Sequence, residues 1–396
     1  MRSPDVLIIG AGVIGLSIAW SQAQQGARVL VIDPFPGMGC GASGAASGIL
    51  LPPIGRRQQT IWGQRQHLAW QQWPVWRYAV ESASGIDIGW MPCGALRFMA
   101  HRPRQLGPDQ RWHADGRALE PVLAAIAPPY GALETPRGGH IQPLALLAAL
   151  HAAVRSAGGQ VQTTSIWRLI RLTACPAIVT AYTVDHQRIC ARLIVVAAGE
   201  QTAALVEPLG IRLSLTRDAG AILHVRQVPR PSRLICRERV TAAAKPDGTV
   251  VITGAHWGDV APRLTLERLA DLWEGATHAL GDSGVVHGAW TGVRVRGPQG
   301  YPVIGRVDGV NLAIATGFGS QGYLLAPIVG TLLDTPLDPE RLTTPVSSPS
   351  AALGAAHDGE SGLGNGSTGV ECDDAAQGID TATMNASMEA RNSGMT

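Results

Sequence analysis

The first part of the chain alternates between short apolar runs and a longer segment of mixed character. Residues 5–10, DVLIIG, and residues 27–33, ARVLVID, are continuous apolar runs with the length of buried strands. Residues 11–26, AGVIGLSIAWSQAQQG, lie between them and have the pattern of a turn followed by a helix. We therefore expect a strand, a tight turn, a helix and a second strand at the start of the chain.

The same alternation returns in the middle of the chain. Residues 141–157 place their apolar positions on helical spacing, residues 159–165, GQVQTTS, have a strand pattern, and residues 191–199, ARLIVVAAG, form another buried-type run. This material predicts that the first domain is resumed here after an interruption.

The interrupting segments have a different period. Residues 93–100, 219–226 and 248–256 alternate apolar and polar positions, as antiparallel strands with one buried face do. Residues 264–280 form an amphipathic helix pattern. The pattern therefore predicts an α/β + β fold, in which a discontinuous nucleotide-binding domain is interrupted twice by a β-rich domain.

The expected boundaries follow from these patterns. The last segment is rich in small and polar residues and nearly lacks large apolar ones, so we expect it to be disordered. The segments are 1–85, 141–210 and 288–340 for the nucleotide-binding domain, 86–140 and 211–287 for the substrate domain, and 344–396 for the disordered tail.

Composition narrows the function classes. The chain has 396 residues, 45% of them hydrophobic, but no run of 18 apolar residues, so no membrane span is expected. Its six cysteines are scattered without a C-x-x-C pair, which argues against a metal site or disulfides and favours the cytoplasm. The net charge of +2 gives little reason to expect nucleic-acid binding. Lys245 is the single lysine among 32 lysines and arginines.

The turn after the first strand has the spacing of a dinucleotide-binding loop. In GAGVIG, Gly10 permits the tight turn, Gly12 lets a pyrophosphate approach the backbone, and Gly15 allows the helix to pack on the strand. The helix N-terminus adds N–H donors and the positive end of a dipole. Asp33 ends the second strand, where a carboxylate can accept hydrogen bonds from a ribose. These features together predict a dinucleotide site.

Two further stretches favour FAD over NAD. Residues 39–53, GCGASGAASGILLPP, are small enough to let backbone pass along a large ligand, and their serines can donate hydrogen bonds. Residues 316–327, TGFGSQGYLLAP, repeat the order of glycine turn and helix start. A second set of backbone N–H groups can lie beside the pyrimidine edge of a flavin, which gains negative charge on reduction.

Several of these stretches occur in one order that resembles the D-amino-acid oxidase-like flavoproteins, especially the glycine oxidases of thiamine synthesis. They are GAGVIG with Asp33, GASGAASGIL, GGHIQPLALLAAL, VVAAG, GVRVRGPQGYPVIG and ATGFGSQGYLLAP. The resemblance covers roughly residues 5–335. It implies an FAD-binding, Rossmann-like domain of the glutathione-reductase type with an interleaved antiparallel-sheet substrate domain.

The resemblance also assigns residues to the parts of FAD. Besides the three turn glycines, the implied cofactor-binding residues are Val13 and Ile14 at the diphosphate, Asp33 and Pro34 at the adenosine ribose, Ala42, Ser43, Ser47, Gly48 and Ile49 along the flavin, and Phe318, Gly319, Ser320, Gln321, Gly322, Tyr323 and Leu324 at its pyrimidine end.

Arg294 is the implied catalytic residue, because the family binds its substrate carboxylate with an arginine just before the P-x-I-G strand. An arginine fork suits a planar carboxylate. Two positions depart from the glycine oxidases: Ser320 replaces a second arginine, and Thr241 stands near the place of a tyrosine. Gly319 and Ser320 instead resemble the flavin domain of a bacterial enzyme that oxidises the carboxymethylaminomethyl group of wobble uridine in tRNA.

The resemblance implies oxidative deamination of glycine, a related small amino acid or an N-substituted glycine. Hydride would pass from Cα to flavin N5, and dioxygen would reoxidise the flavin to give hydrogen peroxide. The implied partners are therefore an amino acid or amine and dioxygen, and a homo-oligomer is left open. The alternatives are the tRNA oxidation, and a flavin-binding subunit or scaffold without turnover of its own.

Other polar and aromatic residues have simpler interpretations. We interpret His140 and His256 as structural histidines rather than as active-site groups. The tryptophans, among them Trp62, Trp70, Trp73 and Trp76, are expected to serve packing rather than base stacking.

Overall fold

The computed structural model describes residues 3–35, 39–53, 58–107, 109–120, 131–237, 240–258, 261–281 and 284–337. The tail 344–396, for which disorder is predicted, lies outside the described residues, as does the side chain of His256.

A six-stranded sheet carries the first glycine turn. Its strand order is β18-β19-β12-β1-β2-β8, and all neighbours are parallel except β18 and β19. The carboxyl ends of β1, β2 and β8 therefore lie at one edge. The strands are β18 (Val303–Arg306), β19 (Leu312–Thr316), β12 (Leu193–Val196), β1 (Val6–Ile9), β2 (Val29–Asp33) and β8 (Gln160–Thr163).

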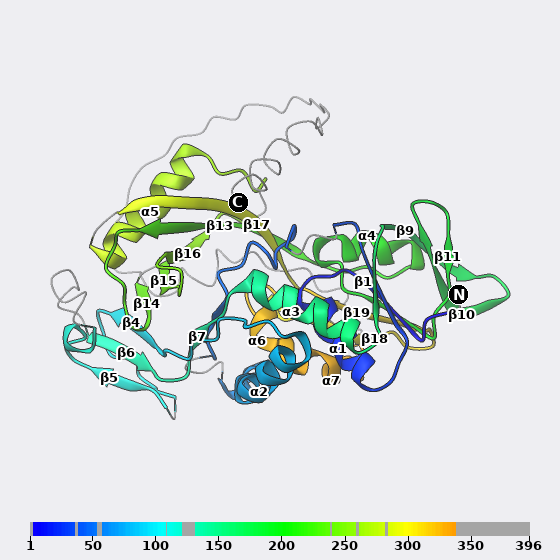
Figure 1. Ribbon diagram of the computed structural model, residues 1–396, viewed down its shortest axis with the longest axis horizontal. Coiled ribbons are helices and arrows are strands. Elements are labelled where there is room, and N and C mark those ends of the chain that lie inside the picture. The colour runs from blue at the N-terminus through cyan, green and yellow to red at the C-terminus, as the bar shows by residue number, and fades with distance from the viewer. Residues whose placement is uncertain are drawn as a thin grey trace, which may run out of the picture. The chain divides into compact units, whose positions relative to one another are not determined.

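Both faces of this sheet are covered, which explains the continuous apolar runs in its strands. Val6 and Ile8 pack among the helices on one face, whereas Leu7 and Ile9 pack on the other. The first face is covered by α1 (Val13–Gln24), α2 (Ile61–Ser84), α3 (Pro143–Ser156), α6 (Gly322–Leu325) and α7 (Val329–Leu332), as Figure 1 shows. The second is covered by α4 (Thr202–Val206) and by a sheet of β9 (Ile166–Leu172), β10 (Cys175–Thr183) and β11 (Arg188–Ile189).

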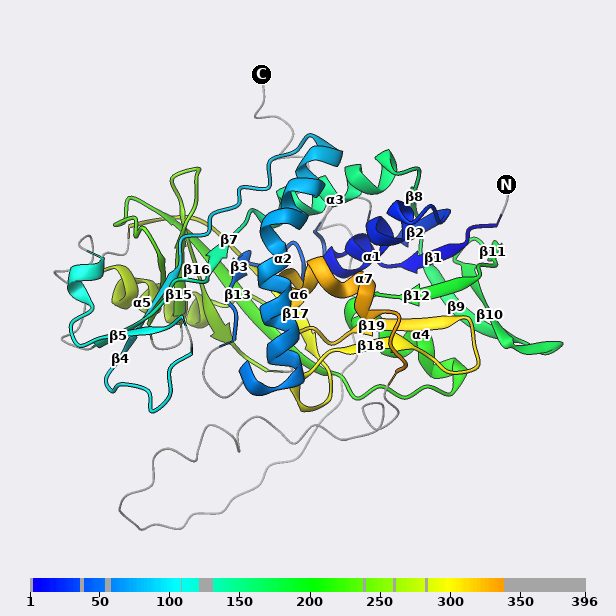
Figure 2. The ribbon, with the colours of Figure 1, turned by 90° about the horizontal axis from the view of Figure 1, so that it is seen from below.

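An eight-stranded sheet forms the other large layer, and α5 (Leu266–Leu280) packs against it (Figure 2). Its order is β17 (Val285–Arg296), β13 (Thr216–Arg226), β16 (Val250–His256), β15 (Val240–Ala244), β14 (Leu234–Arg237), β4 (Ala95–Met99), β6 (Gly131–Thr135) and β5 (Arg111–His113). A two-stranded pair, β3 (Ile49–Leu50) and β7 (Gly139–His140), completes the strands.

The predicted fold class is confirmed, with one difference in the large sheet. Strands β4 and β14 pair in parallel, whereas the other neighbours are antiparallel. The two strands are far apart in sequence, so no hairpin forces them to be antiparallel. Strand β17 begins at Val285, so the boundary predicted at residue 288 falls inside a strand, and the division into domains stays a prediction.

Helix α2 was not predicted from the pattern. It contains Pro74, and its apolar residues do not form a clear stripe. The tryptophans on it pack as expected: the Trp73 ring is fully buried, stacks on Trp90 at 5.4 Å between centroids, and meets Trp76 edge-on at 5.0 Å.

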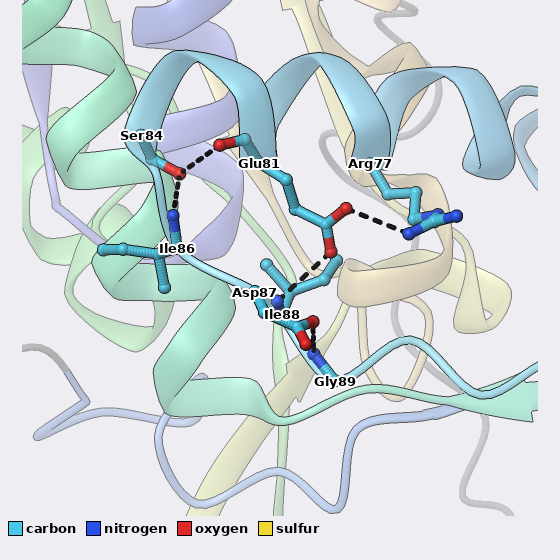
Figure 3. Close-up of polar contacts among 7 residues, drawn as sticks. All are labelled: Arg77, Glu81, Ser84, Ile86, Asp87, Ile88 and Gly89. Atoms are coloured by element: carbon cyan, nitrogen blue, oxygen red, sulfur yellow. Dashed lines mark hydrogen bonds and ion pairs between the residues drawn. The ribbon is translucent and has the colours of Figure 1, made fainter.

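Polar contacts tie the chain that follows α2 back onto the helix (Figure 3). Glu81 accepts a hydrogen bond from the Ile88 N–H at 3.2 Å and pairs with Arg77 at 2.9 Å. Ser84 accepts from the Ile86 N–H at 3.1 Å. The Ile88 carbonyl then accepts from the Gln142 N–H at 2.9 Å, so this corner is connected to the start of α3.

Candidate cofactor and active site

A cavity of about 920 Å³ extends from the carboxyl ends of β1 and β2 to the eight-stranded sheet. Its lining includes Arg294 and most of the residues predicted to bind the cofactor. Gly15, Gln321 and Leu324 are the predicted residues that do not line it. The structure thus brings together the first glycine turn, the segment 39–49, Arg294 and the second glycine turn.

The first glycine turn has no room for side chains at two of its three glycines. Gly10 has φ +109°, and a Cβ there would lie 2.4 Å from the Ala197 carbonyl oxygen. A Cβ on Gly15 would lie 1.9 Å from the Gly10 carbonyl oxygen, because the helix packs directly on the turn. Gly15 therefore acts in packing, as predicted, and not as a lining residue.

Asp33 holds this turn through its carboxylate. One oxygen accepts from the Ala11 N–H at 2.7 Å and the other from the Phe35 N–H at 2.9 Å. A carboxylate has about four acceptor positions, so capacity remains for a ribose hydroxyl. The sequence pattern did not predict these two backbone contacts.

The N-terminus of α1 points at Ser43. The Val13 N–H donates to Ser43 Oγ at 3.1 Å, which leaves the serine hydrogen free to donate to an anion. No acidic residue occupies the first turn of this 12-residue helix, so its dipole is uncompensated there. Such an N-terminus suits a phosphate group.

The segment 39–49 has irregular backbone up to the start of β3 at Ile49, with two glycines at positive φ, Gly39 and Gly48. Side chains from outside the segment fix its conformation through two hydrogen bonds. The Tyr323 hydroxyl donates to the Ser43 carbonyl at 2.7 Å, and the Lys245 ammonium donates to the Ser47 carbonyl at 2.9 Å. Burial raises the pKa of Tyr323 well above its usual range, so this hydroxyl stays a donor.

The second glycine turn differs from its prediction in length. Helix α6 has only four residues and passes through a 3-10 turn into α7, because Pro327 cannot continue an α-helix. The turn itself is as expected, with Gly317 and Gly319 at φ +75° and +54°. Leu324 is buried in the core, and its carbonyl accepts from Trp73 Nε1 at 3.0 Å.

Arg294 lies on β17 directly opposite Asp218 on β13. Asp218 nevertheless forms its close ion pair with Arg296, at 2.6 Å. No residue in the described ranges forms a hydrogen bond or ion pair with the Arg294 side chain. Burial lowers the pKa of this guanidinium and Asp218 opposes the change, so Arg294 stays charged. Arg294 is therefore a cation on the cavity wall that pairs with none of the residues that the structure describes.

The two departures from the family pattern have different positions. Ser320 is exposed and lines the cavity, so no guanidinium occupies that place. Thr241, expected near the site, does not line the cavity and hydrogen-bonds Cys236 Sγ at 3.7 Å. Its cross-strand partner Thr253 lines the cavity instead. The order of the strands decides this, because β16 lies next to β13 whereas β15 is one strand farther away, and a single sequence gives no signal for that order.

His140 is buried behind the cavity rather than in its lining, as predicted for a structural histidine. Burial first, and the charge of Lys245 second, lower its pKa to about 3. No group of three residues suited to a metal ion occurs in the part of the chain that the structure describes. Among the same residues, no helix is long and apolar enough to cross a membrane.

The site fits FAD by its own geometry. It offers a glycine turn with no room for a Cβ at Gly10 or Gly15, and a helix N-terminus with a serine hydroxyl beside it. It also offers a carboxylate at the end of β2 and a long cavity that leads to the guanidinium of Arg294. A molecule with a diphosphate and a planar ring matches this order of features.

Comparisons with known proteins agree with this fit. The chain is 26% identical over 362 residues to glycine oxidase of Geobacillus kaustophilus, covering 83% of this chain and 91% of that protein. The crystal structure of that glycine oxidase superposes with a TM-score of 0.76 at 25% identity and covers 87% of this chain and 99% of the other.

Two other relatives differ in name and in length. One of the subunits of opine oxidase from Agrobacterium tumefaciens is 26% identical over 325 residues, with 76% of this chain and 85% of that protein covered. The tRNA 5-methylaminomethyl-2-thiouridine biosynthesis bifunctional protein of a Polaromonas species is 26% identical over 392 residues, and the match spans 86% of this chain but 58% of that protein.

Residues 5–334 match the family described as FAD dependent oxidoreductase. This match covers most of the chain, and the fold and the cavity agree with it. The chain therefore belongs to the FAD dependent oxidoreductase family.

Proposed function

We propose that this protein is an amine oxidase that deaminates glycine, a related small amino acid or an N-substituted glycine. The observation that carries the proposal is the unpaired guanidinium of Arg294 in the cavity. A half-buried charge without a hydrogen-bonding partner among the described residues is costly, and an anionic ligand relieves that cost. The similarity to glycine oxidase and to a subunit of opine oxidase supports an amino-acid substrate.

The cofactor would lie along the cavity from the first glycine turn to the second. The turn at residues 10–15 would hold the diphosphate, and Asp33 with Pro34 the adenosine ribose. Ala42, Ser43 and residues 47–49 would border the flavin, and the lining residues of the second glycine turn would border its pyrimidine end, namely Phe318, Gly319, Ser320, Gly322 and Tyr323. When bound, the flavin supplies the hydride acceptor.

The protein's own contribution is then orientation. Arg294 would bind the substrate carboxylate with two parallel hydrogen bonds and so fix the direction of the Cα–H bond. The wall around Arg294 includes the small residues Gly220 and Gly292 beside larger apolar residues such as Ile222, Val293 and Val295. Gly292 packs against Ala45, because a Cβ on Gly292 would lie 2.4 Å from the Ala45 Cβ.

A substrate screen tests the proposal. The purified protein is supplied with glycine, sarcosine and D-alanine in air, and hydrogen peroxide is measured. Anaerobic bleaching of the flavin absorbance by the same compounds separates oxidation of the substrate from reaction with dioxygen. Failure of all small amino acids and N-substituted glycines to bleach the flavin would exclude the proposal. Peroxide from one of them would support it, and a role in thiamine synthesis would then be the next question.

The tRNA oxidation is the second candidate, and Ser320 favours it. The exposed serine leaves the cavity mouth without the second arginine, and the chain matches a tRNA-modifying bifunctional protein over most of its length. Anaerobic flavin reduction by tRNA that carries the carboxymethylaminomethyl group, but not by glycine or sarcosine, would select this function. A flavin-containing protein that none of these compounds reduces would instead act as a flavin-binding subunit or scaffold.

A further inference from the structure

Lys245 is a buried cation that the proposed chemistry does not use. It is the single lysine of the chain, it directly follows β15, and its side chain is only 2% exposed. No carboxylate of the described residues lies within ion-pair distance of its ammonium group. Burial lowers its pKa to about 8. A group with such a desolvation cost is expected to have a specific task.

The ammonium group has three acceptors. Lys245 Nζ donates to the Ser47 carbonyl at 2.9 Å, to the Ile141 carbonyl at 2.9 Å and to His140 Nδ1 at 3.3 Å. An ammonium has three N–H bonds, so each has one acceptor. The planar fork of an arginine would not match this arrangement, which agrees with a lysine in a chain that otherwise uses arginine.

The acceptors belong to two segments that meet at the cavity wall. Ser47, Gly48 and Ile49 line the cavity, and Ile141 follows β7. The two segments approach closely, because the Ile141 N–H donates to the Gly48 carbonyl at 2.9 Å. A Cβ on Gly48 would lie 2.3 Å from the Ile141 carbonyl oxygen. Lys245 therefore connects the large sheet to the joint between this wall and β7.

We propose that Lys245 is a positioning residue for the cofactor, which fixes the Ser47–Ile49 wall in the conformation that binds the flavin. The inference rests on the proposed placement of the flavin along this wall. Without the ammonium group, the buried Ile141 carbonyl and the partly buried Ser47 carbonyl lose this donor, and the wall can relax away from β7. Lys245 acts through the wall and does not itself line the cavity.

The test measures FAD affinity of the holoenzyme without any substrate. Holoenzyme is diluted, and the fluorescence of released FAD at equilibrium gives its Kd. For Lys245→Met we expect a Kd at least tenfold above that of the natural protein. The matched control is Arg230→Met, which removes a 2.8 Å hydrogen bond to the Lys245 carbonyl without touching the wall, and its Kd should stay within twofold. Equal Kd values for Lys245→Met and the natural protein would overturn the inference.

A pH series gives a second readout that a purely structural role would not produce. The titratable neighbours of Lys245 are His140, His224, Asp247 and Cys93. Burial holds the pKa of the two histidines at about 3 and about 4, the pKa of Asp247 is lowered, and burial raises that of the Cys93 thiol. Lys245 is thus the member of this cluster that titrates near pH 8.

The natural protein should therefore bind FAD more weakly as the pH rises from 7 to 9, and Lys245→Met should lack this transition. If Lys245→Met does not fold, a constant Kd of the natural protein over this range is enough to overturn the inference. The variant Gly48→Ala tests the placement of the flavin along the Ser47–Ile49 wall independently of Lys245. If Gly48→Ala raises the Kd and Lys245→Met does not, the flavin lies along the wall but Lys245 does not position it. If neither variant changes the Kd, the proposed placement of the flavin along the wall is wrong. The outcome of the substrate screen affects neither result.

Discussion

Replacing Arg294 with methionine removes the unpaired guanidinium from the cavity and leaves the nearby ion pair intact. Asp218 keeps Arg296 at 2.6 Å, so this buried carboxylate retains its ion pair. The guanidinium itself gives up an unfavourable burial. We therefore expect the free energy of unfolding and the FAD content of Arg294→Met to be unchanged or slightly raised, whereas oxidation of amino acids should fall.

The size of this fall follows from the bond that is lost. A bidentate, charge-assisted contact in a site with little water contributes about 2–4 kcal/mol. Since 1.36 kcal/mol corresponds to a factor of ten in rate, kcat/KM for glycine should fall about thirty- to a thousand-fold. With Ser320 in place of a second arginine, the upper end is expected. Arg294→Lys keeps the charge without the fork and should restore only part of the loss.

Steady-state kinetics on two substrates decide whether Arg294 acts on the carboxylate. An amine of matched size without a carboxylate should be oxidised equally by Arg294→Met and the natural protein. The control variant is Arg296→Met, which removes the ion pair of Asp218, a residue only 6% exposed, so it should lower the thermal midpoint. Equal losses on both substrates, or loss of FAD from Arg294→Met, would refute the assignment.

Three further predictions follow from buried groups. The pKa of His140 is lowered from 6.5 to about 3, so between these values only the unfolded chain binds the proton. Stability should therefore fall as the pH drops from 6.5 to 3, by up to about 4 kcal/mol, and thermal melts of His140→Gln should show a weaker dependence. Gly10→Ala should prevent FAD retention, measured by absorbance, because its Cβ would lie 2.4 Å from the Ala197 carbonyl oxygen. Trp73→Phe leaves the Leu324 carbonyl without its 3.0 Å donor and should cost about 1–3 kcal/mol in denaturant unfolding.

The sequence predicts best those parts of the fold in which burial alone decides which residue types can occur. Residues 5–33 and 191–199 form strands buried on both faces, so nearly every position must be apolar, and the pattern is unambiguous. Helix α2 was missed because its burial comes from large tryptophan rings rather than from a regular stripe, and because Pro74 argues against a helix. Tertiary packing overrides local propensity there.

The candidate site was predictable where backbone geometry requires particular residues. Gly10 needs positive φ, and such a requirement is visible in one sequence. The choice between Thr241 and Thr253 depends on the order of β16 and β15 in the sheet, and the contacts of Lys245 join positions about a hundred and two hundred residues away. Neither leaves a local pattern, so both needed the structure.

The charges around the cavity explain why one arginine is left unpaired. Of the described lining residues, Asp33, Glu200 and Arg294 carry a formal charge. Asp33 is occupied by two backbone N–H groups, and Glu200 pairs with Arg217 at 3.1 Å. Both anions thus already have hydrogen-bond donors, whereas none of the described residues pairs with the Arg294 side chain, and no acidic residue lies in the first turn of α1. The cavity therefore offers two separate positions that attract anions, one suited to the diphosphate of FAD and the other to the carboxylate of the proposed substrate.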